Sequence, residues 1–357
     1  MSHTEIILLS CTVLSSIPTL ASLCKLDYWW VRGFDFPRLQ ISLLQLILLA
    51  LCVILLPFDE LWHYLLPIFI AGNFFYQGYK IFPYTILARK QVYRSKTSNG
   101  KNSITIMVCN VLKDNRQYHR LLDLVNKEQP NILLTLETDS QWEKALQELE
   151  QRYPYTMKVP QDNRYGMHLY SNLKLKDTEV KRIIKKDIPS LHGYIQLSNG
   201  KWIRFHCLHP EPPSPTEDDT STNRDAELLL VGKDIKEEQK STLVFGDLND
   251  VAWSRTTRLF QATSGLLDPR IGRGFFNTFH TKYPWLRWPL DHLFHTDDFT
   301  LVSLRRLQKM GSDHFPILIS LCHEPRAENI QEEPSPDPEE KEWADKKIEE
   351  GNPREDL

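Results

Sequence analysis

Two patterns of hydrophobic and polar positions follow one another along this chain, and the change comes near residue 80. In the first part, residues 6–23, 39–56 and 61–79 are mostly apolar. Each stretch is close to the length that a helix needs to cross a bilayer. Only four residues separate the second stretch from the third, which is typical of a transmembrane hairpin. The pattern therefore predicts about three membrane-spanning helices within residues 1–80.

A soluble alternative, in which these stretches are buried helices of a globular domain, fits the pattern less well. Residues 39–56 are almost uninterrupted leucine and isoleucine, so a helix there has no polar face. Tryptophan and tyrosine residues lie near the predicted ends, where a membrane interface favours them: Trp29, Trp30, Trp62, Tyr64, Tyr76 and Tyr79. We therefore expect a multi-pass protein of the cell (inner) membrane.

Basic residues bear on the side of the membrane that the rest of the chain occupies. They cluster in two regions, Lys25, Arg32 and Arg38 before the second stretch and Lys80, Arg89, Lys90, Arg94 and Lys96 after the third. With three helices, both regions lie on the same side. The positive-inside rule then places the remainder of the chain in the cytoplasm.

The second pattern is an alternation of short apolar strands with amphipathic helices over residues 104–322, after a basic and polar linker at residues 81–103. An Asn-Gly pair at residues 199–200 predicts a hairpin. Strands are predicted at 104–109, 132–136, 194–197, 202–207, 242–245, 290–294 and 315–321, and helices at 116–127, 140–151 and 223–238. A domain of this length can bury a two-sheet core.

Residues 323–357 are acidic and proline-rich and show no periodic apolar positions. Such a composition predicts a disordered tail, and a solvated extension is favoured over a segment that binds a partner. No obligate protein partner can be inferred from the sequence.

Composition excludes two further classes of protein. The net charge is −3, so the chain has no global basic field of the kind that binds nucleic acid without specificity. The six cysteines show neither a Cys-x-x-Cys pair nor a zinc spacing. We expect buried free thiols and no disulfide framework.

Polar residues recur where the predicted strands end. In residues 243–250, an apolar strand runs into Gly246, Asp247 and Asn249, and the alternation of side chains puts Asp247 and Asn249 on one face. One such position is usually a cap or a turn former. The recurrence of six after apolar runs indicates a shared site: Asn110, Glu137, His209, the Asp247–Asn249 turn, Asp291 and the Ser312-Asp313-His314 segment.

This set of motifs, in this order, resembles the endonuclease/exonuclease/phosphatase superfamily of metal-dependent phosphoesterases. The resemblance covers residues 104–322. It implies an α/β (α+β) four-layer sandwich, in which two packed, mostly antiparallel sheets are flanked by helices, here preceded by transmembrane helices. It also implies a site at one edge of the sandwich.

The resemblance implies a role for each of these residues. Water attack on phosphorus builds negative charge, so the site needs a divalent cation, a proton acceptor and cationic or amide donors. Mg²⁺, or alternatively Mn²⁺, is the implied cofactor, with Glu137, Asn110 and Asp313 as its candidate ligands. Asp247 would activate the water, Asn249 would orient water or phosphate, His209 would donate to a phosphoryl oxygen, and Asp291 would orient His314 against the phosphoryl group. The sequence leaves open how the carboxylates divide metal binding and base catalysis.

Other residues are candidates for substrate binding. Arg273 and Asn277 belong to a cationic, glycine-containing loop at residues 270–279, and Arg224 could add a further phosphate contact. His168 is a weaker candidate. A loop at residues 209–219 is proline-rich and acidic, and Tyr283, Trp285 and Trp288 form an aromatic run suited to lipid, to bases or to core packing.

Three functions are compatible with these features. The first is a membrane-anchored phosphoesterase that hydrolyses a phosphate ester or anhydride, with a lipid phosphate or pyrophosphate preferred as substrate. The second is an endonuclease or exonuclease, and the third is a non-enzymatic membrane module that retains the fold. The arrangement resembles a membrane-anchored bacterial subgroup that includes glycopeptide-resistance proteins acting on undecaprenyl pyrophosphate. In that subgroup the domain lies outside the cytoplasm, which conflicts with the basic-residue count.

Overall fold

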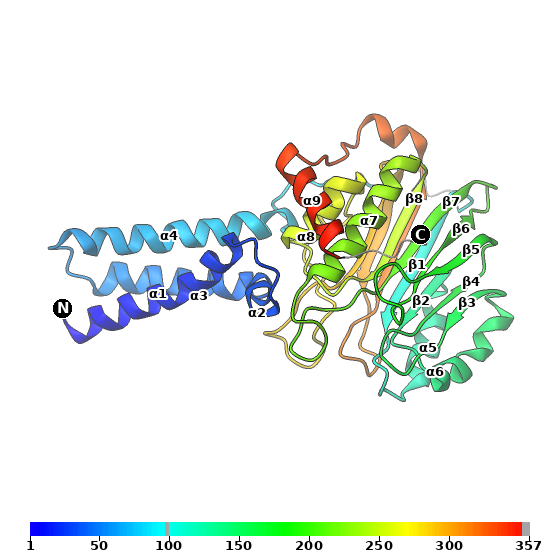
Figure 1. Ribbon diagram of the computed structural model, residues 1–357, viewed down its shortest axis with the longest axis horizontal. Coiled ribbons are helices and arrows are strands. Elements are labelled where there is room, and N and C mark those ends of the chain that lie inside the picture. Colours follow the sequence, from blue (N-terminus) through cyan, green and yellow to red (C-terminus); the bar gives the residue numbers. More distant parts are fainter. Residues whose placement is uncertain (97–99, 352–357) are drawn as a thin grey trace.

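A helical bundle projects from one side of a β-sandwich (Figure 1). The structure, a computed structural model, describes residues 1–96 and 100–351. Three long helices build the bundle: α1 (His3–Leu23), α3 (Arg38–Leu55) and α4 (Leu61–Ile81). The short helix α2 (Trp29–Arg32) lies between the first two, where the bundle meets the sandwich.

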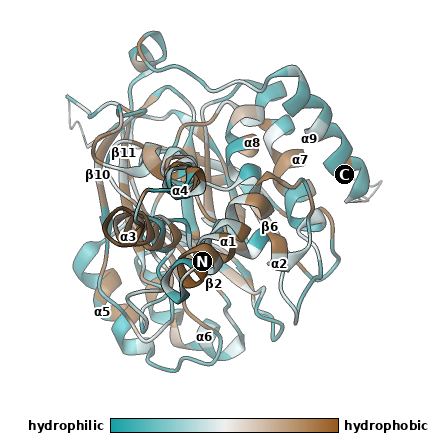
Figure 2. Cartoon of the chain, turned by 90° about the vertical axis from the view of Figure 1, so that its left-hand side faces the viewer, coloured by the Kyte–Doolittle hydropathy of each residue, from teal (hydrophilic) through white to brown (hydrophobic). Residues whose placement is uncertain are grey.

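Two of the bundle helices, α1 and α3, are long and apolar enough to cross a membrane. Figure 2 shows both in brown, the colour of apolar residues. The third predicted span also forms a helix, α4, but that helix does not reach the same apolar character because it carries His63, Asn73 and Gln77. These side chains are buried within the bundle, and the Gln77 amide donates to Thr19 Oγ1 at 3.0 Å and accepts from Arg38 at 2.7 Å.

Two mixed sheets pack face to face and form the sandwich. The order of strands is β10-β11-β1-β2-β4-β3 in the first sheet and β5-β6-β7-β8-β9 in the second. Only the β1–β2 and β7–β8 pairs are parallel among the described strands. The strands are β1 (Ser103–Asn110), β2 (Ile132–Leu136), β3 (Tyr155–Val159), β4 (Met167–Ser171), β5 (Leu175–Lys181), β6 (Ser190–Gln196), β7 (Trp202–Leu208), β8 (Thr242–Asp247), β9 (Asp291–His295), β10 (Phe299–Arg306) and β11 (Ile317–His323).

Alternation along the strands builds three apolar layers. Between the sheets, Ile106 and Val108 of β1 pack in one cluster with Phe205 and Phe245 of the second sheet. Intervening residues such as Met107 face the outer helices. Helices α5 (Tyr118–Glu128) and α6 (Ser140–Ala145) cover the first sheet, and α7 (Thr222–Glu238) and α8 (Arg255–Ser264) cover the second. The predicted four-layer sandwich is confirmed.

Several predicted elements differ from the structure. The predicted helix at 140–151 is divided into α6 and a 3₁₀ turn at Gln147–Gln151. Strands β3, β4, β5 and β10 and helix α8 were not predicted. In β5 most side chains are exposed, so no apolar alternation marks it. None of the six cysteines, all within the described residues, forms a disulfide; four are buried, but Cys24 is exposed.

The predicted disordered tail is wrong for its central part. Helix α9 (Pro338–Glu350) begins with an Asp337–Glu340 capping box. It lies against α7 and α8, with Ala344 in a cluster with Leu229 and Leu259. The ammonium group of Lys347 pairs with Asp27, beside α2. Residues 352–357 of the predicted tail lie outside the described residues.

The predicted linker at residues 81–103 is largely packed against the sandwich. The buried Tyr84 hydroxyl donates to the carbonyl of Ala252 at 2.6 Å. Farther along, the Ser95 amide donates to the Leu301 carbonyl at 2.9 Å, so this segment pairs with the edge strand β10. Residues 97–99 lie outside the described part. The chain that follows α4 therefore packs against the sandwich and connects it to the bundle.

Candidate active site

Strand direction brings the predicted site residues to one edge of the sandwich. Asn110 ends β1 and Asp247 ends β8. Strand β9 runs antiparallel to β8, so its first residue, Asp291, lies directly across from Asp247. Strand β11 runs antiparallel to β1, and His314 precedes its start. Residues more than 200 positions apart in the sequence therefore meet at this edge.

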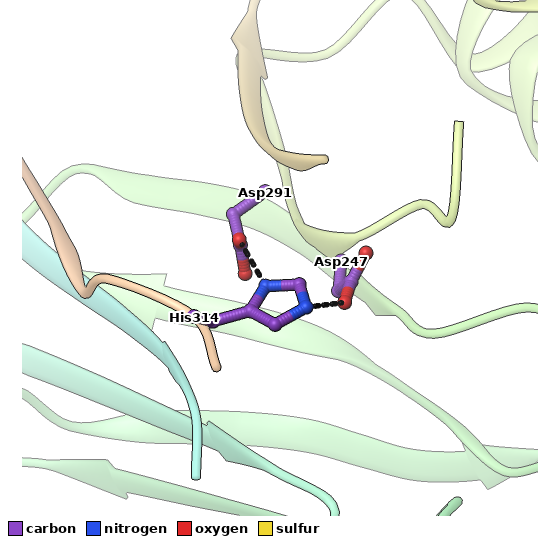
Figure 3. Close-up of side chains that lie close together, drawn as sticks. All are labelled: Asp247, Asp291 and His314. Carbon is purple, nitrogen blue, oxygen red and sulfur yellow. Dashed lines mark hydrogen bonds and ion pairs between the residues drawn. The ribbon is translucent and has the colours of Figure 1, made fainter. Parts of the chain in front are cut away.

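His314 lies between two carboxylates (Figure 3). Its Nδ1 is 2.8 Å from Asp291 Oδ2, and its Nε2 is 3.6 Å from Asp247 Oδ2. All three side chains are buried. Burial opposes protonation of the ring, but Asp291 and Asp247 outweigh it and raise the pKa of His314 to about 10. Burial also raises the pKa of Asp247 from its usual value.

Asn110 joins Asp247 to the predicted metal ligand Glu137. Its amide nitrogen is 2.9 Å from Glu137 Oε1 and 3.2 Å from Asp247 Oδ2. Its amide oxygen accepts from the Leu112 backbone N–H at 3.0 Å, which fixes the orientation of the amide. Asn110 thus presents a donor to the carboxylates, and its predicted role as a metal ligand through oxygen does not match this geometry.

Glu137 occupies a strained position directly after β2. Its φ is +62°, an uncommon conformation for a residue with a side chain. Its second carboxylate oxygen accepts from the Lys113 N–H at 3.3 Å. Burial raises the pKa of this carboxyl, and hydrogen bonds from Asn110 and Lys113 partly offset the effect. Strained residues of this kind often occur at functional sites.

The Gly-Asp-x-Asn turn needs its glycine for steric reasons. Gly246 has a φ of +152°, and a Cβ there would lie 1.9 Å from the Leu208 carbonyl oxygen. After the glycine, the Asn249 N–H donates to Asp247 Oδ1 at 3.0 Å and orients that carboxylate. The Asn249 amide donates to the Pro210 carbonyl at 2.9 Å and so holds the loop after β7 at the site.

His209 is buried beside this centre, and its Nδ1 has no hydrogen-bond partner among the described residues. Burial lowers the pKa of His209, so the ring is neutral at pH 7. Asp313 is half-buried and accepts a hydrogen bond from Ser312 Oγ at 3.3 Å. Its charge acts to raise the pKa of Glu137, which agrees with a position on the same side of the site.

Of the four predicted substrate-binding residues, Arg224, Arg273 and His168 are engaged with other groups of the fold, and Asn277 is adjacent in sequence to Thr278 at the site. Arg224 is buried and pairs with Asp225 at 2.9 Å and Asp250 at 3.2 Å, so it neutralises internal carboxylates. The Arg273 guanidinium donates to the backbone carbonyls of Val92 and Pro269. Both predicted roles need correction, because these cations are already engaged within the fold.

His168 and Asn277 differ from one another in their surroundings. His168 is buried in β4 on the same face as Tyr170, which packs against the outer helical layer. Its predicted substrate contact therefore does not match its position. Asn277 directly precedes Thr278, whose hydroxyl accepts from the Asp291 N–H at 3.1 Å. The Asn277 amide oxygen is buried and has no hydrogen-bond partner within the described chain.

Two aromatic residues at the site were not predicted to have a role there. The Phe279 ring lies 5.0 Å from the His314 ring, and the Tyr165 ring lies 5.5 Å from the His209 ring. Phe279 ends the glycine-containing loop at residues 270–279, and that position offered a weak sequence indication. Tyr165 belongs to a loop with no recognisable motif, so only the folded chain places it.

The donor set fits a hard divalent cation near Glu137. Asp247, Asp291 and His314 have ligand atoms within 4.8 Å of one another. Within this group both His314 nitrogens face carboxylates, at 2.8 Å from Asp291 and 3.6 Å from Asp247, so the ring is already engaged by the two acids. The Glu137 carboxylate has no ion pair with a basic side chain in the described residues. Carboxylate oxygens without such a partner suit Mg²⁺ or Mn²⁺.

Comparisons with known proteins agree with this geometry. The model of the endonuclease/exonuclease/phosphatase family matches residues 107–314. No curated protein sequence matches the chain. Similar solved structures include a protein of unknown function from Enterococcus faecalis V583, with 15% identity and a TM-score of 0.51 over 62% of this chain and 100% of that one.

Two further structures share the fold at low sequence identity. The catalytic domain of human Nocturnin, solved with bound sulfate, has 15% identity and a TM-score of 0.51 over 67% of this chain and 98% of its own. D. rerio TDP2, solved with a single-stranded DNA product, has 17% identity and a TM-score of 0.50 over 61% and 98%. With a family match over more than half of its length and a strand edge that assembles the motif residues, this chain belongs to the endonuclease/exonuclease/phosphatase family of metal-dependent hydrolases.

Proposed function

We propose that this hydrolase is anchored in the membrane and cleaves a phosphate ester or anhydride of a lipid-linked substrate, such as a lipid phosphate or pyrophosphate. The observation that carries the proposal is a short hairpin, residues 279–288, that joins the catalytic histidine to the bundle of apolar helices. A site built into the base of a membrane anchor suits a substrate that stays in the membrane.

The chemistry follows from the groups at the strand edge. Asp247 is the candidate acceptor for the proton of the attacking water. The protonated His314, held by Asp291, is placed to stabilise negative charge on the phosphoryl oxygens, and His209 can donate from the opposite side. Mg²⁺, or Mn²⁺, bound at Glu137 with Asp313 nearby would supply charge stabilisation for the phosphoryl group. The Asn110 amide donates to both Glu137 and Asp247 and so holds these two carboxylates next to each other.

The hairpin contacts both the site and the bundle. At its base, the Phe279 ring packs on His314 at 5.0 Å and stacks with Trp288 at 6.1 Å. The Trp288 ring meets Phe36, between α2 and α3, edge-on at 5.6 Å. At its tip, the Trp285 carbonyl accepts from the Gln40 amide in the first turn of α3 at 2.6 Å. Three aromatic rings thus connect the start of α3 with the catalytic histidine.

The tip of the hairpin exposes apolar surface beside the bundle. Trp285 is 82% exposed, and Tyr283 and Leu286 are also exposed. Trp30 near the other end of the junction is exposed as well. Tryptophan and tyrosine at the base of apolar helices suit the interfacial zone of a bilayer. We therefore assign α1, α3 and α4 to a multi-pass membrane anchor and residues 283–286 to the membrane surface.

The substrate preference is argued from charge. The net charge is −3, and the loop that follows His209 contains Glu211, Glu217, Asp218 and Asp219. Lys185 pairs with Glu211 and Asp218, and the remaining acids, Glu217 and Asp219, keep the loop next to the site acidic, which disfavours a nucleic-acid backbone. A lipid phosphate presents only one or two phosphoryl groups and brings an apolar chain that the exposed hairpin can meet.

Purified full-length protein in a neutral detergent tests the proposal. We expect Mg²⁺-dependent phosphate release from a long-chain prenyl pyrophosphate, and a loss of at least about 100-fold in His314→Ala. His119→Ala removes an exposed histidine on α5 and serves as the matched control. Cleavage of DNA by the wild type, lost in His314→Ala and without any release from lipid, would instead favour the nuclease. No metal-dependent cleavage of either substrate or of a simple phosphodiester would favour a non-enzymatic module.

A further inference from the structure

A second charged depression lies away from the catalytic edge. It is a groove of about 490 Å³ between the chain that follows α4 and the edge strand β10. Its lining residues come from three segments and contain no member of the candidate catalytic set. They are Ile86, Lys90 and Arg94 after α4, Gly272, Arg273 and Phe276 in the loop before β9, and Leu301, Val302, Ser303 and Leu304 in β10.

The walls of this groove are fixed by backbone contacts. Gly272 donates to the Pro83 carbonyl at 2.8 Å and has a φ of +75°. A Cβ on Gly272 would lie 2.7 Å from the Lys90 Cα, so the two segments approach as closely as a glycine allows. On the other side, the Leu301 N–H donates to the Tyr93 carbonyl at 2.9 Å. The groove is therefore part of the folded domain.

Three cations line the groove without a compensating acid. Within the described chain, no carboxylate lies within 4.0 Å of the charged groups of Lys90, Arg94 or Arg273. Burial lowers the pKa of Arg273, the charge of Arg94 lowers it further, and the charge of Asp268, which is paired with Arg270, offsets only part of this, so the guanidinium groups of Arg273 and Arg94 repel each other. An anion placed between them would relieve this repulsion and gain hydrogen bonds from Arg94.

Apolar side chains complete the lining. Ile86, Phe276 and Leu304 lie in the same groove as the cations. Ile86 is 78% exposed and the adjacent Leu87 is 80% exposed, and both follow the end of α4 by only five or six residues. Three cations beside an exposed apolar wall, at the base of an anchor helix, match a ligand with an anionic head and a hydrocarbon chain.

We propose that this groove binds the phosphate headgroup of an anionic membrane phospholipid. The inference rests on the membrane attachment proposed above, but it concerns a different site. Lys90 and Arg94 hold the headgroup, and Ile86 and Phe276 contact the chain. Arg273 donates to the Val92 and Pro269 carbonyls and contributes its positive charge to the groove. The bound lipid fixes the distance and tilt of the catalytic domain relative to the bilayer. Lys90 and Arg94 then serve a lipid site, so they do not count simply as markers of the cytoplasmic side.

Lipid retention by full-length protein provides the test. The protein in neutral detergent is titrated with phosphatidylglycerol, phosphatidylcholine or inorganic phosphate, and bound molecules are counted by native mass spectrometry. We expect tight retention of one phosphatidylglycerol and a loss of about 30-fold in the double variant Lys90→Gln/Arg94→Gln. The double variant Arg89→Gln/Lys96→Gln removes the same charge from the same segment outside the groove and should retain the lipid.

A second variant separates the groove from general charge effects. Ser303→Phe places a ring in the groove and leaves all three cations in place, and we expect the same loss of phosphatidylglycerol. Equal retention by the two double variants, equal retention of phosphatidylcholine, or displacement by inorganic phosphate alone would overturn the inference. Cleavage of a soluble phosphodiester by the same samples reports on the catalytic site. If the wild type does not cleave the soluble phosphodiester, the proposed catalytic function is contradicted. The measurement of phosphatidylglycerol binding in the groove remains valid in that case.

Discussion

The imidazole Nδ1 of His314 lies 2.8 Å from Oδ2 of Asp291. The two residues come from the segment before β11 in one sheet and from the start of β9 in the other, so their pair joins the two halves of the sandwich. Because the pKa of His314 is raised to about 10, the ring is a cation throughout the neutral range. The pair therefore sets the pH range in which the site carries positive charge.

Replacement of Asp291 by Asn should remove the negative charge that raises the pKa of His314. The pKa of His314 falls, since a neighbouring negative charge is lost while the burial remains. We expect activity on a soluble phosphodiester to fall about 100-fold to 10,000-fold, and the alkaline limb of the pH–rate profile to move to lower pH. Asp298→Asn alters a second buried pair, with His323 at 3.0 Å, and should leave the limb in place. An unchanged limb in Asp291→Asn would show that His314 is not the group that titrates.

Glu137 is predicted to hold the divalent cation. Glu137→Gln keeps the shape and the hydrogen bond from Asn110 but removes the charge. We expect the Mg²⁺ concentration for half-maximal activity to rise by at least about 10-fold, and calorimetric binding of Mn²⁺ to weaken in parallel. Glu143→Gln alters a partly exposed residue on α6 and is the control. If Glu137→Gln binds Mn²⁺ with the affinity of the wild type, Glu137 is not a metal ligand and the cation binds elsewhere.

Arg224 is predicted to act on stability and not on substrate binding. Arg224→Met leaves Asp225 and Asp250 buried without their cation. The loss of one partner from such a buried group costs about 3–5 kcal/mol, so the melting temperature should fall. Lys233→Met on the same helix breaks only an exposed pair and should cost less than about 1 kcal/mol. A raised KM with unchanged melting temperature would restore the role expected from the sequence.

Trp285 distinguishes lipid from soluble substrates. Trp285→Ser removes the most exposed ring of the hairpin tip without altering a residue of the catalytic centre. If the tip enters the membrane surface, cleavage of a lipid substrate in vesicles falls about 10-fold or more, while cleavage of a soluble phosphodiester is unchanged. Trp202 lies at the start of β7, at the opposite end of the sheet from the site, so Trp202→Ser should change the cleavage of both substrates equally. Equal losses in Trp285→Ser would argue against an interfacial role.

His168 contributes a pH dependence of stability that is independent of the site. Burial lowers its pKa from 6.5 to about 3, so the folded ring stays neutral while the unfolded ring binds a proton below pH 6.5. His168 therefore does not lower the free energy of unfolding above pH 6.5. Between pH 6.5 and about 3 it lowers that free energy by about 1.4 kcal/mol per pH unit. We expect His168→Leu to melt with a smaller difference between pH 7 and pH 5 than the wild type. An equal difference would assign the acid sensitivity to other buried histidines.

The fold class was predicted from the motifs that resemble the endonuclease/exonuclease/phosphatase superfamily, and apolar runs in the sequence predicted most of the strands whose ends meet at the candidate site. Apolar runs of four to eight residues between amphipathic helices predicted the strands that carry Asn110, Glu137, Asp247 and Asp291. These strands are buried on both faces, so their composition alone marks them. Strands with little burial, such as β5, escaped prediction because solvent exposure removes the alternation.

The folded chain shows which charged and polar side chains are available to a substrate or a metal, and the sequence did not. Arg224, Arg273 and Asn110 each looked suited to a phosphate or a metal. The fold commits them to buried carboxylates, to backbone carbonyls and to a fixed amide orientation. A side chain's hydrogen-bond partners come from segments far away in the chain, so its availability cannot be read from local sequence.

The secondary structure of the acidic tail also depends on contacts with distant segments. Its composition predicts disorder, yet α9 forms because a capping box starts it and α7 and α8 offer an apolar surface for Ala344 and Trp343. In the same way, apolar runs predicted the three long helices of the bundle, but only packing placed the rings of Phe36, Trp288 and Phe279 in a row that ends at His314. Local sequence determines which segments are apolar or extended. Contacts between segments far apart in the chain determine which side chains meet and therefore where a site can form.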